Sequence, residues 1–303
     1  MPFASGAAAQ RLALPRLPEH QIEPLAAAYA RANAAKRRST LLLIAAVAIA
    51  FLVASGVAEV DLEKFFANID RFTSYIARLF YLDSGAPVWS DPAEWLWGWK
   101  KWLALLGDTL LIAYLGTLIG LAAAFSLCFL ASANLNSNAW TRNLVRKFLE
   151  FCRTVPELVF ALIFVVAFGL GPLPGVLALA IHSTGALGKL FSEVVENIDM
   201  KPVEGVTAAG ATWWQTVHMA VVPQVLSNFA SYGLLRFEIN VRGASVMGFV
   251  GAGGIGQELV ESIRKFYYSD VSALLLLIIA TVMIIDVATE RLRHHFLGQG
   301  GRT

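Results

Sequence analysis

Apolar segments long enough to cross a membrane constrain the fold of this chain more than any other feature. A helix needs about 20 apolar residues to span the hydrocarbon core of a bilayer. Six segments approach this length, the third and fourth being short: 40–59, 105–131, 155–170, 175–191, 223–250 and 271–289. Only 15% of the residues are charged and 57% are hydrophobic, whereas a soluble domain carries about 25% charged residues. We therefore predict an all-α integral membrane protein with about six transmembrane helices.

The start of the chain is the one region whose composition indicates weak order. Residues 1–38 are rich in Ala and Pro and end in the basic cluster Lys36-Arg37-Arg38. A secretory signal peptide is the alternative interpretation of residues 36–58. Its basic region would begin late, however, and its apolar run would exceed the usual length of about 7–15 residues. We predict a basic cytoplasmic segment, 1–39, followed by an uncleaved first transmembrane helix.

A run of glycine and proline separates the third and fourth apolar segments. Its sequence is Gly169-Leu-Gly171-Pro172-Leu-Pro174-Gly175, and such a cluster breaks any helix. We predict a tight hairpin here, in which either short segment can fail to cross the membrane completely.

The distribution of Lys and Arg predicts the orientation. If the N-terminus lies in the cytoplasm, the predicted cytoplasmic segments hold 14 of these residues and the outer segments hold 7. Because basic residues concentrate in cytoplasmic loops, we predict that both termini lie inside, including a tail at 294–303. Between them, residues 105–293 are predicted to form the transmembrane core.

Residues 40–104 combine the first transmembrane helix with an unusual outer segment. After the helix, apolar residues recur at nearly helical spacing with charged residues between them, which is typical of an amphipathic helix at a membrane surface. A cluster of tryptophans then precedes the second span, and we interpret it as an interfacial aromatic belt that anchors the chain without binding a specific ligand. Its members are Trp89, Trp95, Trp97, Trp99 and Trp102.

Several residues within the predicted spans are better explained by helix packing than by a catalytic or metal-binding role. Gly116, Gly120 and Ala124 recur at a spacing of four, which lets a neighbouring helix approach closely. Cys128 lies in an apolar run and has no metal or redox spacing, so we predict no disulfide. His182 can be read as a proton relay, but we favour a hydrogen-bonded packing histidine.

The motifs of soluble enzymes are absent or misplaced. Gly251-Ala-Gly253-Gly254-Ile-Gly256 matches the dinucleotide fingerprint, but it follows an apolar run rather than a strand. We interpret these glycines as an extracytoplasmic loop that turns the chain sharply between the fifth and sixth helices. The sequence has no phosphate-binding loop, and its five histidines form no ligand cluster. We therefore predict no metal site and no cofactor on this chain.

Residues 199–224 predict a helix–glycine–helix elbow between the fourth and fifth spans. Pro202 can open a short helix through 203–209, Gly210 can end it, and Pro223 can start the next span. On the cytoplasmic side such an elbow would present a short helix to a partner. The alternative is an ordinary loop.

The elbow resembles the loop of ABC importer permeases with the pattern E-A-A-x3-G-x9-I-x-L-P. Glu204, Gly210 and Pro223 stand at the spacing of that family, while Gly205 and Val206 replace its two alanines. The Ile and Leu positions carry other small or aliphatic residues. The resemblance implies a coupling helix that sits in a cleft of a separate ATPase subunit. The coupling residues that it implies are Glu204, Gly205, Ala208, Ala209, Gly210 and Pro223.

Four further stretches are similar to the phosphonate-transporter permeases, a type I ABC importer family, over about 105–290. They are Gly116-Thr-Leu118, Arg153-Thr-Val-Pro-Glu-Leu158, Arg236-Phe-Glu-Ile-Asn-Val-Arg242 and Val250-Gly-Ala-Gly-Gly-Ile-Gly256. The resemblance implies an inner-membrane homodimer of permeases, two ATPase subunits that bind ATP and Mg²⁺, and an extracytoplasmic binding protein. It also implies a phosphonate, phosphite or related oxyanion as the substrate.

The charged stretch in the fifth span leaves two hypotheses open. A charge near the bilayer centre costs at least ~2.5 kcal/mol, so it must be paired or face a polar path. Glu238 and Arg242 share one helix face, and Arg236 and Asn240 share another. Either Glu238 and Arg242 form an ion pair for packing, or an arginine, preferably Arg236, attracts a passing anion.

Two rival functions follow from weaker features. The glycine loop alone would equally suit an importer permease for an amino acid such as methionine. A membrane-embedded enzyme would need catalytic groups clustered in the spans, and the sequence offers no such cluster.

Overall fold

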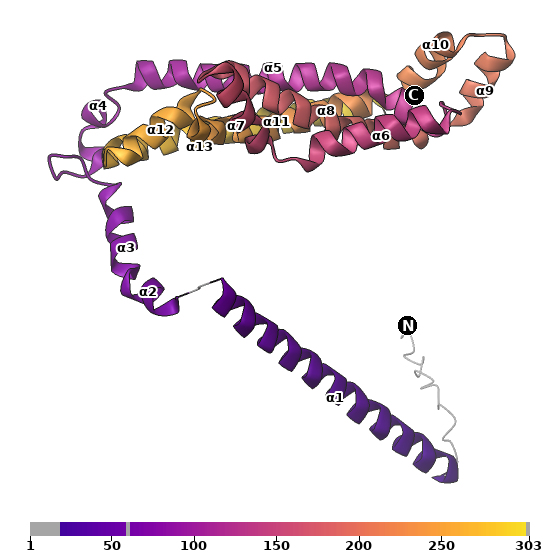
Figure 1. The fold of residues 1–303 in the computed structure, drawn as a ribbon, viewed down its shortest axis with the longest axis horizontal. Helices are drawn as coiled ribbons and strands as arrows, with labels where there is room; N and C mark the ends of the chain where they lie inside the picture. The colour runs from indigo at the N-terminus through magenta and orange to yellow at the C-terminus, as the bar shows by residue number, and fades with distance from the viewer. Residues whose placement is uncertain (1–18, 59–60, 301–303) are drawn as a thin grey trace, which may run out of the picture. The chain divides into compact units, whose positions relative to one another are not determined.

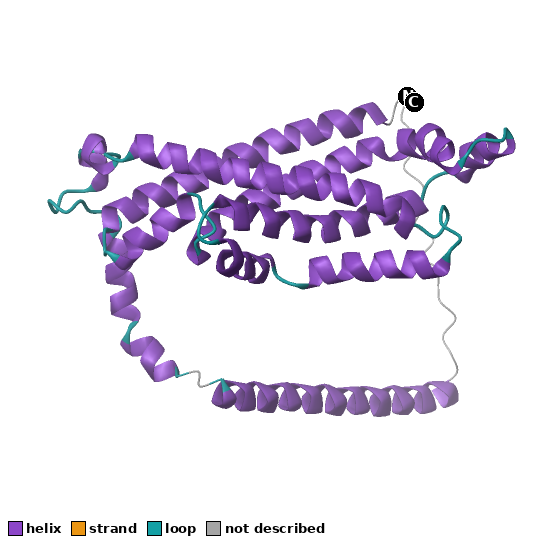
Figure 2. Cartoon of the chain, turned by 45° about the horizontal axis from the view of Figure 1, so that its top comes forward, coloured by secondary structure: helices purple, strands orange, loops and turns teal. Residues whose placement is uncertain are grey.

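The computed structural model describes residues 19–58 and 61–300, and in this part of the chain every regular element is a helix (Figures 1 and 2). The chain divides into two units, residues 1–72 and 73–303. The first elements are α1 (Glu19–Val57), α2 (Leu62–Ala67) and α3 (Ile69–Arg78), the last of which crosses the boundary between the units. The second unit continues with η1 (Val88–Ser90), α4 (Pro92–Trp95), α5 (Trp99–Ala131), α6 (Ala139–Thr154), α7 (Glu157–Phe168), α8 (Pro172–Glu196), α9 (Met200–Ala208), α10 (Trp213–Thr216), η2 (Val217–Val221), α11 (Val222–Met247), η3 (Gly248–Val250), α12 (Ile255–Arg264) and α13 (Tyr268–Gly300).

Helix α1 starts well before the first predicted span. It runs for 39 residues from Glu19, so the prediction of weak order is wrong for residues 19–38, while residues 1–18 lie outside the described part. The cause is the composition of this region, because alanine has the highest helix propensity of all residues. The stretch Ala27–Val57 is long and apolar enough to cross a membrane.

The predicted amphipathic segment is helical but forms two pieces. Asp61 caps α2 by accepting a hydrogen bond from the backbone of Lys64 at 2.9 Å, and α2 ends at Asn68 before α3 begins. The aromatic residues Phe65 and Phe66 are exposed, and α3 buries none of its residues. The helical prediction is confirmed, and the position at the membrane surface stays a prediction.

Among the described residues, four helices are long and apolar enough to cross a membrane, within α1, α5, α8 and α13. A fifth span arises if α6 and α7, which meet at an angle of 85°, count as one broken span. Helix α7 alone has 12 residues, or about 18 Å, which is shorter than the ~30 Å hydrocarbon core. Helix α11 occupies the predicted fifth span with 26 residues, but charged residues interrupt its apolar sequence. The six predicted segments thus correspond to α1, α5, α7, α8, α11 and α13.

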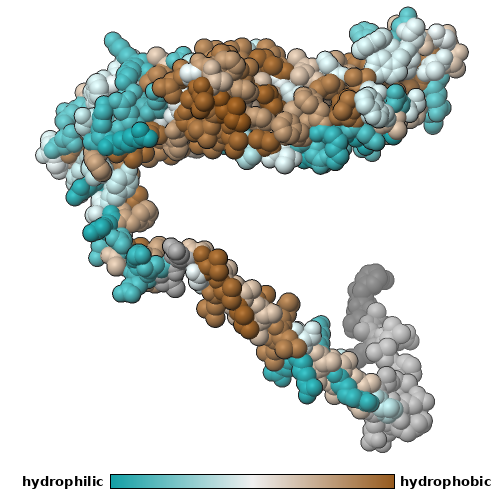
Figure 3. Space-filling view, viewed as in Figure 1, coloured by the Kyte–Doolittle hydropathy of each residue, from teal (hydrophilic) through white to brown (hydrophobic). Residues whose placement is uncertain are grey.

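The long helices of the second unit lie side by side in a bundle (Figure 2). Figure 3 shows hydrophobic surface around the middle of this bundle and hydrophilic surface gathered toward its ends. The stripe of small residues packs α5 against α8 as predicted. A β-carbon at Gly116 would lie 2.6 Å from the Cβ of Leu179, and one at Gly120 would lie 2.6 Å from the Cβ of Ser183. The two backbones therefore approach closely, without room for larger side chains.

The hairpin between α7 and α8 is confirmed, but its break is shorter than predicted. Gly169 and Gly171 have positive φ of 86° and 143°, where glycine is the residue that fits without strain. Helix α8 already begins at Pro172 rather than at residue 175. Proline is tolerated in the first turn because its missing N–H would have no partner there anyway.

Helix α12 was not predicted from the sequence. The glycine loop turns the chain as expected, and a ten-residue amphipathic helix then follows it before α13. The ends of α11 and α12 touch through their backbones, because a β-carbon at Gly256 would lie 2.0 Å from the carbonyl oxygen of Ser245. Glycine at this position allows the two helices to cross in direct contact.

The tryptophan cluster does more than anchor the chain at an interface. Trp95 donates from its indole nitrogen to the Ser272 hydroxyl at 2.9 Å, and Trp97 donates to Asp270 at 2.9 Å. Trp102 is almost completely buried. Trp95 and Trp97 thus bind the start of α13, and Trp102 fills the core, so the prediction of an aromatic belt is wrong for Trp102. Trp89 and Trp99 remain exposed, as a belt requires.

Candidate functional site

The elbow between α8 and α11 has the predicted helix–glycine–helix form. Helix α9 begins at Met200, earlier than predicted, because the Asp199 side chain accepts a hydrogen bond from the backbone N–H of Lys201 at 3.1 Å. Gly210 follows the helix with φ of +85°. A residue with a β-carbon is strained in this region, by ~1–2 kcal/mol. The glycine therefore sets the turn between α9 and α10.

The outer face of the elbow consists of the residues that the sequence assigned to coupling. Val203 is buried and holds α9 on the bundle. The predicted residues Glu204, Gly205, Ala208, Ala209 and Gly210 are all exposed, and no neighbouring atom would contact a β-carbon at either glycine. Small exposed residues on a short, firmly held helix leave a smooth surface on which another protein can pack.

The second arm of the elbow runs without interruption into α11. Helix α10, the π-helical turn η2 and α11 follow one another directly. In the π-turn the N–H of Val222 binds the carbonyl of Val217, five residues earlier. Pro223 explains this turn, because proline cannot donate a hydrogen bond and its ring crowds the carbonyl four residues before it. Pro223 thus shapes a continuous helix rather than starting a separate one, which corrects the prediction.

Gln224 closes the base of the elbow, a role that sequence reasoning missed. Its side-chain oxygen accepts from the Asp199 backbone N–H at 3.1 Å, and its nitrogen donates to the Asp199 carbonyl at 3.2 Å. The amide therefore pairs with the backbone like another peptide unit. The start of α9 is tied to the start of α11, so the elbow and α11 move together.

Trp213 fastens the elbow to the loop that follows α5. Its indole nitrogen donates to the carbonyl of Leu135 at 3.0 Å, whereas the neighbouring Trp214 is 72% exposed. The two rings meet edge to face with centroids 4.6 Å apart. Trp214 adds an exposed aromatic surface to the elbow, and exposed tryptophan is enriched where proteins bind one another.

Helix α11 carries its charged residues on two faces, as the spacing predicted. On one face Arg242 forms ion pairs with Glu238 and, at 2.6 Å, with Asp286 of α13. Thr289 of α13 also approaches Glu238, at 3.4 Å. The positive charge of Arg242 is thus matched by two carboxylates, which fixes α11 against α13. The ion pair that the packing hypothesis requires is present, and its role in packing stays a prediction.

The other face of α11 enters a polar cluster near the middle of the bundle. Asn240 is 1% exposed, and its side-chain nitrogen donates to the Thr117 and Ser183 hydroxyl oxygens, each at 2.8 Å. Arg236 donates from Nε to the same Ser183 oxygen at 3.0 Å. The side-chain oxygen of Asn240 has no partner in the described structure. Asn240 therefore joins α5, α8 and α11, and it shares the Ser183 hydroxyl with Arg236.

Arg236 differs from Arg242 in its charge balance. Among residues 19–58 and 61–300, no carboxylate oxygen lies within 4.0 Å of Arg236. Glu157 and His182 lie close enough to interact with it electrostatically. A guanidinium in the middle of a membrane protein without a direct counter-ion is costly unless it serves a ligand or a polar path.

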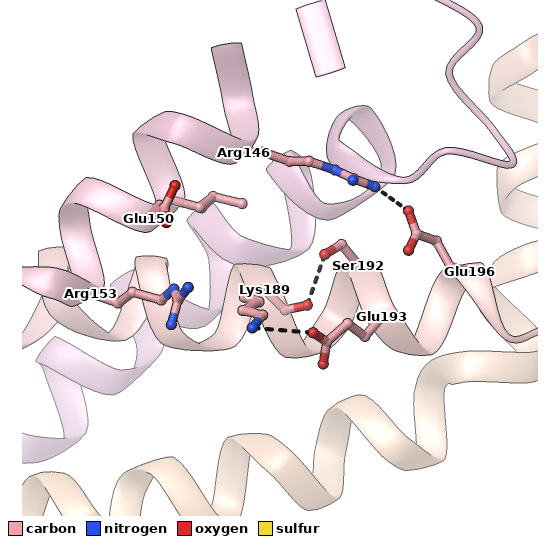
Figure 4. Close-up of a pocket in the computed structure, with 8 residues that line it drawn as sticks. Arg146, Glu150, Arg153, Lys189, Ser192, Glu193 and Glu196 are labelled. Carbon is pink, nitrogen blue, oxygen red and sulfur yellow. Dashed lines mark hydrogen bonds and ion pairs between the residues drawn. The ribbon is translucent and has the colours of Figure 1, made fainter. Parts of the chain in front are cut away.

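A second group of charges lies between α6 and α8 (Figure 4). Arg146 forms an ion pair with Glu196, and Lys189 lies 3.4 Å from Glu193. Together with Arg153 and Glu150, these side chains line a pocket of about 200 Å³. Basic and acidic groups are equal in number here, so the pocket carries no net attraction for an anion. We interpret it as a contact that holds α6 on α8.

The glycine loop connects helices and lacks the strand–loop–helix setting of a dinucleotide-binding fingerprint. Gly251, Gly253 and Gly254 all have positive φ, and the loop joins two helices rather than a strand and a helix. Thr109 of α5 accepts the N–H of Ile255 at 2.9 Å, and Gly251 accepts the N–H of Gly171 at 3.0 Å. The loop thus ties α11 and α12 to α5 and to the α7–α8 hairpin.

Comparison with known proteins relates this architecture to a family. The sequence model of the family described as "Binding-protein-dependent transport system inner membrane component" matches residues 116–297, which include the elbow and the polar cluster. The chain belongs to this family. It is therefore a multi-pass inner membrane protein and a transporter permease rather than an enzyme, as the sequence predicted.

Several relatives of the permease are named for phosphorus oxyanions. The phosphite transport system permease protein PtxC of Stutzerimonas stutzeri is 44% identical over 199 residues, covering 66% of this chain and 72% of the relative. The putative phosphite permease HtxC of the same organism is 31% identical over 277 residues, covering 91% and 94%. The phosphate-import permease PhnE of Mycolicibacterium smegmatis is 40% identical over 188 residues, covering 61% and 35%.

Solved structures confirm the predicted fold class. A chain of the MetNI methionine ABC transporter, in an inward-facing crystal form, aligns with a TM-score of 0.57 over 68% of the permease and 98% of that chain. A second crystal form of the same transporter gives a TM-score of 0.54 over 68% and 98%. The sequence identities are 19% and 21%, so this likeness concerns the fold alone.

Proposed function

We propose that the permease carries phosphite, a phosphonate or a related phosphorus oxyanion through the membrane for an ABC importer. The observation that carries this proposal is that Arg236 has no direct counter-ion among the described residues. This guanidinium lies near the middle of α11, and no carboxylate oxygen of the described residues is within 4.0 Å of it. Arg242, by contrast, is matched by Glu238 and Asp286. A positive group without its own direct counter-ion can attract an anion as it passes.

The elbow is proposed to connect the permease to its source of energy. In this arrangement two copies of the permease pair with two ATPase subunits, which hold ATP and Mg²⁺, and a binding protein delivers substrate from outside. Support comes from the exposed α9 surface and from the spacing of Glu204, Gly210 and Pro223. Since the elbow continues directly into α11, a force on the elbow would also move Arg236.

A panel of solutes tests the substrate. The complete transporter is reconstituted with its ATPase and binding protein, and ATP hydrolysis is measured with phosphite, methylphosphonate, phosphate or methionine. We expect stimulation by at least one phosphorus oxyanion and none by methionine. Stimulation by methionine alone would contradict the proposal and assign the permease to amino acid import.

The proposed topology places both termini and the elbow in the cytoplasm. Single cysteines are introduced at Trp89, which is 68% exposed, and at Gly205 of the elbow. The natural Cys128 and Cys152 are buried and give little background. We expect a membrane-impermeant maleimide added from outside to label position 89 in cells, and to label position 205 only after lysis. Labelling of position 205 in intact cells would overturn the topology.

A further inference from the structure

The break between α6 and α7 places an acid, Glu157, close enough to Arg236 to influence it electrostatically. The residues Val155 and Pro156 separate the two helices, which meet at 85°. Proline ends a helix because it lacks an N–H and restricts the residue before it. Glu157 is the first residue of α7. Non-helical backbone at membrane depth is tolerated where it is covered by protein or lines a polar path, and the side chain of Glu157 at the break is 33% exposed.

His182 of α8 holds this break in place. Its Nδ1 lies 3.1 Å from the carbonyl oxygen of Val155, and its Nε2 lies 3.5 Å from a carboxylate oxygen of Glu157. A carbonyl oxygen only accepts hydrogen bonds, so Nδ1 carries a proton. The imidazole therefore binds the freed carbonyl of the break, and its other nitrogen lies beside the carboxylate that follows it. The position of the break is thus set by α8 as well as by α7.

The carboxylate of Glu157 also lies against α11. A β-carbon at Gly243 would be 3.7 Å from one of its oxygens. Arg236 interacts electrostatically with both Glu157 and His182, and it is bonded to Ser183, the neighbour of His182. Two features favour a negative group at this place, namely the guanidinium and the N-terminal end of α7, whose dipole is positive there. In the described structure the negative group is supplied by the protein itself.

We propose that Glu157 is the resting counter-ion of Arg236 and that the transported oxyanion displaces it. The inference rests on the proposed anion role of Arg236. When no substrate is present, the carboxylate of Glu157 offsets the guanidinium charge across the cluster. An arriving oxyanion takes over the neutralisation of the guanidinium, while the carboxylate of Glu157 stays beside His182. A neutral solute cannot compete with a carboxylate for a guanidinium, so this exchange selects for anions.

The test compares E157Q with R236Q in the purified complex of permease and ATPase. Glutamine keeps the shape of Glu157 and removes its charge, so the competitor for Arg236 is lost. We expect E157Q to bind sodium phosphite about tenfold more tightly than the unaltered complex, because the anion then no longer competes with a carboxylate for Arg236. Binding is followed by the rise in unfolding temperature with phosphite, relative to sodium chloride of equal ionic strength. R236Q should abolish that rise in either background.

A second measurement does not depend on the transported solute. Without Glu157 the charge of Arg236 is uncompensated, so E157Q alone should lower the unfolding temperature by about 2–4 °C. The double variant E157Q/R236Q should recover at least half of this loss. E157D, which keeps the charge on a shorter side chain, should give intermediate values. The matched control is E193Q on α8, whose carboxylate is 52% exposed and pairs with Lys189, and which should change neither measurement.

The outcomes separate this inference from the proposed function. If R236Q abolishes phosphite binding and E157Q weakens or does not change it, the anion role stands and the counter-ion role is overturned. If R236Q leaves phosphite binding unchanged, both are overturned. If the double variant is less stable than E157Q alone, the two residues do not compensate each other, and the inference fails even when the transported solute is a phosphorus oxyanion.

Discussion

The variant R236Q is expected to reduce oxyanion uptake by at least about tenfold while the transporter still assembles. Glutamine removes the positive charge and keeps a polar group beside Ser183, to which Arg236 is now bonded. Charge-assisted hydrogen bonds contribute about 1.5–3 kcal/mol, and each 1.4 kcal/mol corresponds to a factor of about ten. Uptake of labelled phosphite into proteoliposomes measures the effect, and co-purification of the ATPase measures assembly.

Two variants make this result specific. R236K keeps the charge and loses the planar guanidinium, so it should retain part of the uptake. R242Q leaves two carboxylates, Glu238 and Asp286, without their partner, so it should lower assembly or thermal stability before it affects the choice of solute. Normal uptake by R236Q would count against the anion role, and lost assembly would instead favour a packing role for Arg236.

Combining G210V with E204A is expected to abolish transport in the reconstituted complex, although the permease still inserts into the membrane. Gly210 has φ of +85°, where a β-branched residue is strongly strained. The strain alters the turn between α9 and α10, and the loss of Glu204 removes an exposed carboxylate that can bind a basic group of the ATPase. Uptake and ATP hydrolysis are measured together, because uncoupling should leave hydrolysis weak or detach the ATPase.

The control for the elbow variant is G205A. Gly205 lies within α9, has no positive φ, and has open space where a β-carbon would be. Alanine there should preserve transport, and it favours the helix. Full ligand-stimulated ATP hydrolysis in the G210V/E204A variant would show that the elbow does not couple the two subunits.

Hydropathy predicted the transmembrane helices well because burial in lipid demands long apolar runs. It could not predict the sharp angle between α6 and α7, since hydropathy shows only that the charged α6 is followed by residues 155–170, which are apolar except for Glu157. Helix α12 was missed because its glycines were interpreted only as a turn. The buried positions Ile255, Leu259 and Ser262, at intervals of four and three residues, are the signal that could have revealed it.

The sequence predicted those parts of the candidate site whose residues lie on one helix. It missed the contacts that join residues of different helices. Arg236 and Asn240 share a face of α11, and four-residue spacing is enough to see this. Their contacts with Ser183 and Thr117 join residues that are 53 to 123 positions apart, so no local pattern contains them. Gln224 was overlooked for the same reason, because its partner, Asp199, lies on the other side of the elbow.

The π-turn at Val217–Val221 has a consequence for the geometry of the whole elbow. A π-turn holds one residue more than an α-helical turn. Each residue of an α-helix turns the side chains by about 100° around its axis. The extra residue therefore sets the rotational phase of Trp213 and Trp214 relative to Arg236. In a regular α-helix of the same sequence, Trp213 would be rotated by about 100° relative to Arg236. The one additional residue in the π-turn therefore determines how the elbow is rotated relative to α11.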